Sequence, residues 1–199
     1  MHQLPIFLNL TGRTVVLVGE GEAADAKGRL IERAGGRIVQ AWERGATIAF
    51  IAIDDEAEAR IAATALRDRG LLVNVVDRPE LCDFTTPAIV DRAPVTIAIG
   101  TGGASAGLAK AVRQRIEALL PARLGALASA LYTARDAMKA RWPTPADRRR
   151  AIDTALAPRG ALDPLDGAAA DKVDAWGGRG VARQPRRRPK KSRTRPPPS

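Results

Sequence analysis

A run of apolar, mostly β-branched residues that leads directly into a glycine-rich turn and a helical pattern is the feature that most constrains this chain. Residues 14–18, TVVLV, form the continuous apolar run expected of a buried parallel strand. Gly19 and Gly21 then predict a tight turn, and Ala24 is the third small residue of a GxGxxA pattern. This succession is typical of dinucleotide-binding α/β proteins, in which the helix start faces a pyrophosphate. A sharp turn without a ligand is the alternative that these residues alone leave open.

The alternation of strands and helices continues beyond this turn. Apolar runs predict strands at 37–41, 47–53, 71–76 and 95–99, and a helix at about 56–69. Ligands of open α/β sheets bind outside the carboxyl ends of the strands. Asp54, Asp55, Asn74 and Asp77 follow two of these strands or lie at their ends, so we expect them on the rim where a cofactor would lie.

The last third of the chain changes character twice. Helical patterns cover about 106–120 and 124–142, and ADRRRAIDTAL predicts one more helix, whereas residues 158–176 are predicted to be loosely ordered. Residues 177–199 contain nine Arg or Lys, no acidic residue and five Pro, which predicts a disordered tail. Its nine cations account for most of the net charge of +10 and leave +1 on residues 1–176. The tail is either simply solvated or a weak contact for nucleic-acid phosphates or an acidic partner.

Composition excludes some kinds of chemistry. With Cys82 as the only cysteine and His2 as the only histidine, the chain can form neither an internal disulfide nor a Cys/His metal cluster, and we predict no bound metal. The sequence has no apolar run of about 18 residues, and its first residues lack a basic leader and a cleavage site. We therefore expect a cytoplasmic protein without membrane contact.

Several blocks in this order resemble the precorrin-2 dehydrogenase / sirohydrochlorin ferrochelatase family, which is also the N-terminal module of siroheme synthase. The matching blocks are LPIFLNLTGRTVVLVGEGEAADAKGRLIERAG, AIDD, LLVNVVDRPELCDFTTPAIVDR and IGTGGASAGLAKAVRQRIEALLP. The similarity extends over about residues 1–176. The order and spacing of the blocks make the resemblance far more specific than a single glycine motif.

The resemblance implies the architecture and the reaction. The fold class is α/β, with a shortened Rossmann-like parallel sheet at 1–86, a dimerisation segment at 87–120, a small helical domain at 121–176 and the tail at 177–199. The implied activity is NAD-dependent oxidation of precorrin-2 to sirohydrochlorin by a homodimer, with insertion of ferrous ion to give siroheme in some members. NAD is the implied cofactor.

The resemblance also implies roles for individual residues. The family's catalytic aspartate falls on Asp77, a carboxylate suited to accept a proton from a reduced tetrapyrrole. A capping residue at a strand end is the alternative reading of Asp77. The predicted cofactor-binding residues are Gly19, Glu20, Gly21, Glu22, Ala23, Asp54, Asp55 and Asn74. Thr101, Gly102 and Gly103 match the family's second loop, and Lys110 and Arg113 beside it are candidate anchors for substrate carboxylates. An ordinary turn hydroxyl is the alternative for Thr101, and a solvated helix face for the two cations.

One departure from the family affects the cofactor site. About 25 residues that family members carry between the second strand and the AIDD strand are absent, and only QAWERGA, residues 40–46, joins them. A parallel crossover usually needs about a dozen residues. We therefore expect a weakened adenosine side of the NAD site. Two alternatives remain: a truncated member without dehydrogenase activity, and a non-enzymatic protein that contacts nucleic acid through its tail.

Overall fold

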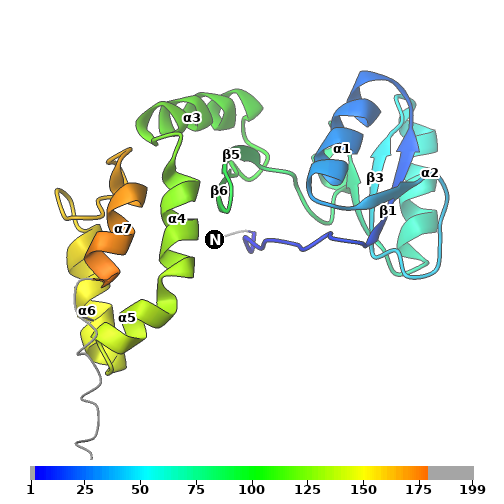
Figure 1. The fold of residues 1–199 in the computed structure, drawn as a ribbon. Helices are drawn as coiled ribbons and strands as arrows, with labels where there is room; N and C mark the ends of the chain where they lie inside the picture. The colour runs from blue at the N-terminus through cyan, green and yellow to red at the C-terminus, as the bar shows by residue number, and fades with distance from the viewer. Residues whose placement is uncertain (1–2, 179–199) are drawn as a thin grey trace, which may run out of the picture. The chain divides into compact units, whose positions relative to one another are not determined.

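The computed structural model describes residues 3–178 (Figure 1). The chain divides into two compact units. One combines Met1–Ile89 with Ala98–Gln114, and the other combines Val90–Ile97 with Arg115–Ser199. We call them the α/β unit and the helical unit. The domain boundaries given above stay predictions.

The α/β unit is built on a four-stranded parallel sheet of order β2-β1-β3-β4. Its strands are β1 (Thr14–Gly19), β2 (Arg37–Val39), β3 (Ile48–Ala52) and β4 (Leu72–Val75), and its main helices are α1 (Gly21–Arg33) and α2 (Glu56–Arg67). Alternate strand residues face opposite sides of the sheet. Val15 packs in one core cluster with Ile31 of α1, and Val16 packs in another with Ala59 of α2. The two helices therefore cover opposite faces of the sheet, as Figure 1 shows, and the predicted α/β class is confirmed.

The short link between β2 and β3 does pass β1, because β2 and β3 flank that strand. Val39 and Ala49 both pair with Val16, so the link bridges only two strand spacings, about 10 Å. Eight extended residues can reach about 28 Å. Ala46 packs on the core cluster of the α2 face, and the Trp42 ring lies 5.9 Å from the Arg69 guanidinium. The register of the strands explains why a crossover without a helix closes here.

A two-stranded sheet, β5 (Ala88–Arg92) and β6 (Val95–Ile99), follows a single 3₁₀ turn, η1 (Pro79–Leu81). Helix α3 (Ala106–Leu119) comes next. Strand β5 was not predicted from the sequence, whereas β6 occupies the predicted residues. No helix in residues 3–178 has the length and apolar character needed to cross a membrane.

Four helices make up most of the helical unit: α4 (Leu124–Thr133), α5 (Arg135–Arg141), α6 (Pro145–Leu156) and α7 (Ala169–Gly178). Leu127, Met138, Leu162 and Val173 are buried together at its centre. The prediction of a loosely ordered segment at 158–176 is wrong, because Leu162 is fully buried and α7 begins at Ala169. Gly177, placed in the predicted tail, is a buried residue of α7; residues 179–199 lie outside the described part.

Candidate active site

The turn between β1 and α1 leaves the first turn of the helix open to a ligand. Glu20 is the N-cap residue and makes no side-chain hydrogen bond to the helix. The first N–H groups of α1 therefore lack a side-chain cap, and such groups attract anions. Gly21 has φ +84°, and a Cβ built on it would meet nothing within 4 Å. Gly19, with φ +108°, packs so closely that a Cβ would lie 1.9 Å from the Ala52 carbonyl oxygen. The turn thus has the open backbone surface that a pyrophosphate requires.

A small cavity of about 250 Å³ lies beside this turn, at the carboxyl ends of β3 and β4. It brings together three of the predicted residues, Ala23, Asp54 and Asp77. Its other lining residues are Ala52, Ile53, Val76 and Arg78. The volume is below the range of about 300–1,000 Å³ usual for whole ligands, so the cavity suits one end of a dinucleotide.

Asp77 lies on strained backbone at the edge of this cavity. Its φ is +57°, in the left-handed region that non-glycine residues seldom adopt, and its side chain is exposed. Next to it, the Arg78 guanidinium donates to the carbonyl oxygens of Ile53, at 2.9 Å, and of Asp54. Arg78 therefore ties the end of β3 to the turn that carries Asp77. The sequence reasoning missed Arg78, although an arginine directly after a candidate catalytic residue was visible.

Cys82 also supports this turn, through hydrogen bonds of its thiol. Its Sγ accepts a hydrogen bond from the Val75 N–H at 3.2 Å and lies 3.3 Å from the Arg78 carbonyl oxygen, to which the thiol can donate. Burial raises the pKa of the Cys82 thiol above its ordinary value. A protonated thiol can bridge these backbone groups. Cys82 thus supports the conformation of residues 75–82.

A half-buried lysine near Asp77 is the second residue that the sequence reasoning missed. Lys27 occupies the face of α1 that also carries the buried Ala24, Gly28 and Ile31, and this position was the available signal. Its Nζ donates to Thr86 Oγ1 at 2.7 Å and lies 5.6 Å from the centre of the Phe50 ring. Burial lowers the pKa of Lys27, and electrostatic attraction to Cys82, in its ionised form, and to Asp77 partly opposes this.

The other predicted cofactor residues have more structural surroundings. Asn74 is 5% exposed, and its Nδ2 donates to the Phe84 carbonyl oxygen at 2.8 Å, which places the amide inside the unit and not on the rim. Its Oδ1 has no protein partner among the described residues. Asp55 is the N-cap of α2 and accepts a hydrogen bond from the Glu58 N–H at 2.8 Å. Glu20 and Glu22 are exposed at the helix start.

The second loop lies close to the turn that carries Asp77. A Cβ on Gly103 would lie 3.9 Å from Cβ of Pro79, two residues after Asp77. Thr101 Oγ1 accepts from the Ser105 N–H at 3.2 Å and donates to the Ser105 carbonyl oxygen at 3.1 Å, which closes the loop before α3. Gly102, with φ +63°, belongs to this bend. Lys110 and Arg113 are on α3 and do not line the cavity.

Comparison with known proteins places these features in a wider group. The chain is 37% identical over 219 residues to a siroheme synthase of Methylococcus capsulatus and covers 46% of its length, with 89% of the chain included. It is 38% identical over 176 residues to a siroheme synthase of Methylobacillus flagellatus, with 75% of the chain and 38% of the relative included. The chain therefore spans less than half the length of these relatives. A solved structure, SirC, precorrin-2 dehydrogenase, has a similar fold, with TM-score 0.66 and 17% identity over 88% of this chain and 98% of that one.

The parallel sheet with helices on both faces and an open, glycine-rich helix start define a Rossmann-like dinucleotide-binding protein. A family model described as putative NAD(P)-binding matches residues 30–88, and this match confirms the prediction of NAD as cofactor. The chain belongs to the precorrin-2 dehydrogenase / sirohydrochlorin ferrochelatase family. The roles of the individual site residues stay predictions.

Proposed function

We propose that this chain catalyses the NAD-dependent oxidation of precorrin-2 to sirohydrochlorin, with Asp77 as the acid/base residue. The observation that carries the proposal is the position of Asp77. Its carboxylate is on strained backbone at a cavity that begins at the dinucleotide-type turn. Strained non-glycine residues cluster at functional sites because the surrounding structure is built to hold them there. Arg78 and Cys82 supply that support.

The residues divide the chemical work between them. NAD, when bound, supplies the hydride acceptor. The backbone of the turn at Gly19–Gly21 binds its pyrophosphate, and Gly21 keeps the approach open. The Asp77 carboxylate accepts the proton that leaves the macrocycle as it is oxidised. The Lys27 ammonium lies close enough for the charge of Asp77 to act on the pKa of the lysine.

One observation favours the second candidate, a family member with impaired NAD binding. The acidic residue that meets the adenine ribose in this fold usually follows the second strand. The first acid after β2 is Glu43, and it accepts a hydrogen bond from Arg37 at 2.7 Å. This exposed ion pair competes with the ribose for the carboxylate.

An assay with the purified chain tests the proposal. Precorrin-2 and NAD are supplied together, and the formation of NADH and sirohydrochlorin is followed. Production of both supports the dehydrogenase. NAD binding by calorimetry separates the two candidates when turnover is absent, since the impaired member binds the tetrapyrrole but no NAD up to millimolar concentrations. A chain that binds neither molecule rules out both.

The remaining parts of the proposal concern partners and location. A homodimer is proposed from the family resemblance, and ferrous ion is proposed as a substrate of a second, chelating reaction. No group of three or more metal-binding side chains is assembled within residues 3–178. An assay with sirohydrochlorin and ferrous or cobalt ions tests the chelating reaction. A measurement of the molecular mass of the protein in solution tests the homodimer. The weak nucleic-acid contact of the tail falls outside the described residues, and the cytoplasmic location stays a prediction from the sequence.

A further inference from the structure

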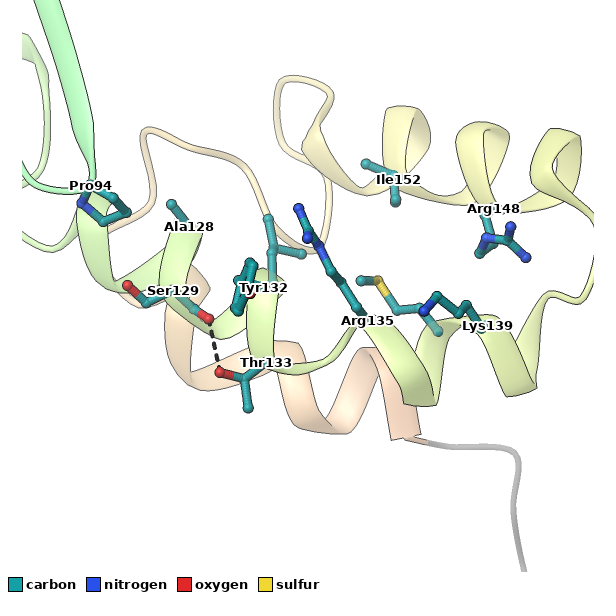
Figure 2. A pocket seen from close by; sticks show the side chains of 11 residues that line it. Pro94, Ala128, Ser129, Tyr132, Thr133, Arg135, Lys139, Arg148 and Ile152 are labelled. Atoms are coloured by element: carbon teal, nitrogen blue, oxygen red, sulfur yellow. Dashed lines mark hydrogen bonds between the residues drawn. The ribbon is translucent and has the colours of Figure 1, made fainter. Parts of the chain in front are cut away.

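The helical unit contains a cavity of about 860 Å³ that none of the roles above explains. Figure 2 shows its lining, which comes from α4, α5, α6 and Pro94 in the bend between β5 and β6. The volume is within the range of about 300–1,000 Å³ usual for sites that bind organic molecules.

The floor of this cavity is apolar and belongs to the core of the unit. Met138 is buried, and Leu131 and Ile152 pack against the same core cluster. Ala128 on α4 leaves space at the wall. Tyr132 adds an aromatic ring that is 67% exposed. A large exposed ring beside an apolar floor offers a surface on which a flat molecule can stack.

Three cations line the same cavity. Arg148 is half-buried, and its Nη1 donates to the carbonyl oxygens of Trp142 and Pro143, both at 2.7 Å. Arg135 stacks on the Tyr132 ring, with its guanidinium carbon 4.4 Å from the ring centre. Within the described part of the chain, neither arginine has a carboxylate at salt-bridge distance. Lys139 pairs with Asp136 at 2.9 Å, but this pair is exposed and exchanges readily with other anions.

We propose that this cavity binds an organic polyanion with a flat, apolar body and carboxylates at its edge. The apolar floor and Tyr132 would hold the body, and Arg135, Lys139 and Arg148 would hold the carboxylates. A carboxylated tetrapyrrole has this chemistry, so the inference rests on the proposed function and adds a substrate-holding surface to it.

A second copy of the chain is a less suitable occupant. In a two-fold contact the same patch of both copies meets, which would bring Arg135, Lys139 and Arg148 close to their own equivalents. Unpaired buried cations are costly, and the acidic residue that pairs with this patch, Asp136, is already bonded to Lys139.

Uroporphyrin III, a stable tetrapyrrole with carboxylates around the whole ring, is the probe for binding to the full chain by fluorescence. Arg135→Gln should weaken its binding about threefold to tenfold, because one charge-assisted contact is lost. Arg149→Gln is the matched control: Arg149 is an exposed cation beside Arg148 on α6 that does not line the cavity. We expect a change below about twofold for this control. Equal losses in the two variants would mean that only net charge matters, and would overturn the proposal.

Two variants that each add a ring, one inside the cavity and one outside it, test the cavity without changing any charge. Ala128→Trp fills the cavity, whereas Ala126→Trp places the same ring on an exposed part of α4 outside it. Only the first should lose uroporphyrin binding, and circular dichroism checks that both fold. Coproporphyrin III, with the same ring and fewer carboxylates, should bind more weakly than uroporphyrin III. Equal affinity for the two porphyrins contradicts the role of the cations. A change in self-association of Ala128→Trp with unchanged porphyrin affinity would identify the cavity as a contact between copies and overturn the proposal.

The experiments distinguish failure of the proposed cavity from failure of the proposed dehydrogenase function. NADH formation from precorrin-2 in the unmodified chain, together with unaltered porphyrin binding in Arg135→Gln and Ala128→Trp, keeps the dehydrogenase and rejects this cavity. Selective loss of porphyrin binding in these variants, with no NADH formed by the unmodified chain, keeps the cavity and rejects the dehydrogenase.

Discussion

The cavity of the α/β unit is formed largely by backbone, whereas the cavity of the helical unit is formed largely by side chains. Beside the Gly19–Gly21 turn, the surface is largely backbone: open N–H groups, a left-handed residue at Asp77 and two tied strand ends. In the helical unit the cavity is lined by side chains from three helices, among them Arg135, Lys139 and Arg148. The first cavity is small and the second is more than three times larger, about 250 against 860 Å³.

The hydrophobic cores of the two units also differ, because one contains a sheet and the other consists mainly of helices. The α/β core contains a sheet with fully buried strand residues such as Val15, Val16 and Val73, whose hydrogen-bonded ladder holds the backbone rigidly. The helical core depends on short helices and on single large residues such as Leu162. Sub-ångström placement of a cofactor suits the first arrangement. A site whose contacts come from long cationic side chains suits the second.

The largest expected effect is the separate unfolding of each unit. Gly19→Ala places a Cβ 1.9 Å from the Ala52 carbonyl oxygen, and Gly125→Ala places one 2.0 Å from that of Ala93. Each should cost about 3 kcal/mol or more of unfolding free energy, but only in its own unit.

Tryptophan fluorescence can read the two units separately. With Trp42→Phe, Trp142 and Trp176, whose ring centres lie 4.8 Å apart, report the helical unit; with both of these changed to Phe, Trp42 reports the α/β unit. Gly21→Ala is the control, since its Cβ meets nothing and only its positive φ costs about 1–2 kcal/mol. If Gly19→Ala lowers both transitions equally, the units do not unfold independently.

The next effect is on turnover. Asp77→Asn should lower dehydrogenase turnover about 100-fold or more, because the amide cannot accept the proton. Unfolding free energy should hardly change, since Asn tolerates left-handed backbone as well as Asp does. Asp77→Ala should add a stability loss of about 1 kcal/mol from backbone strain. Steady-state kinetics and thermal melts measure both, with Asp25→Asn, an exposed carboxylate on α1 outside the cavity, as control. Unchanged turnover in Asp77→Asn would reject the acid/base role.

A smaller effect is expected on cofactor affinity. Gly21→Val should weaken NAD binding about tenfold or more, because its side chain enters the open space at the start of α1. Gly70→Val is matched to it: Gly70 has φ +82° and an equally open surrounding, but it precedes β4 at the opposite end of the strands. Calorimetry with NAD compares the two variants. Similar affinities would reduce the glycine pattern to a structural turn.

The smallest effect concerns the thiol that supports the turn at Asp77. Because burial raises the pKa of Cys82, less thiolate is present at a given pH than in an ordinary cysteine, and alkylation should be slower. The rate of carboxamidomethylation should reach its midpoint at a higher pH in the folded chain than after denaturation. A folded-state midpoint below that of the denatured chain would mean that a neighbouring positive charge, and not burial, controls the thiol.

Features that depend on local backbone preferences, such as the bounds of strands and helices, were predictable from the sequence. Strand β6 has its predicted bounds, and β1, β3, β4 and α2 differ from prediction by one or two residues, because β-branched runs and glycines mark them directly. The grouping of Ala23, Asp54 and Asp77 at one cavity follows from the shared edge of parallel strands.

Features that depend on packing were not predictable. Asn74 precedes Val75 at the end of β4, yet the pleat turns its side chain inward, toward Phe84. Asp55 caps α2, a role that competes with ligand binding for the same carboxylate. The ties made by Arg78 and Cys82, and the cation-lined cavity, join residues of separate elements. No local sequence pattern indicates that these residues lie close together in the fold.

The register around β1 makes the β2–β3 link a natural junction for grafting. The chain leaves β2 and enters β3 at the same level of the sheet, only about 10 Å apart, so an insert needs merely to begin and end at neighbouring points. A helix-strand-helix segment that extends the sheet beyond β2 can meet this condition without shifting β1 or β3. Chimeras that exchange residues 40–47 for longer crossovers could therefore vary the adenosine side of the site while the turn and Asp77 stay in place.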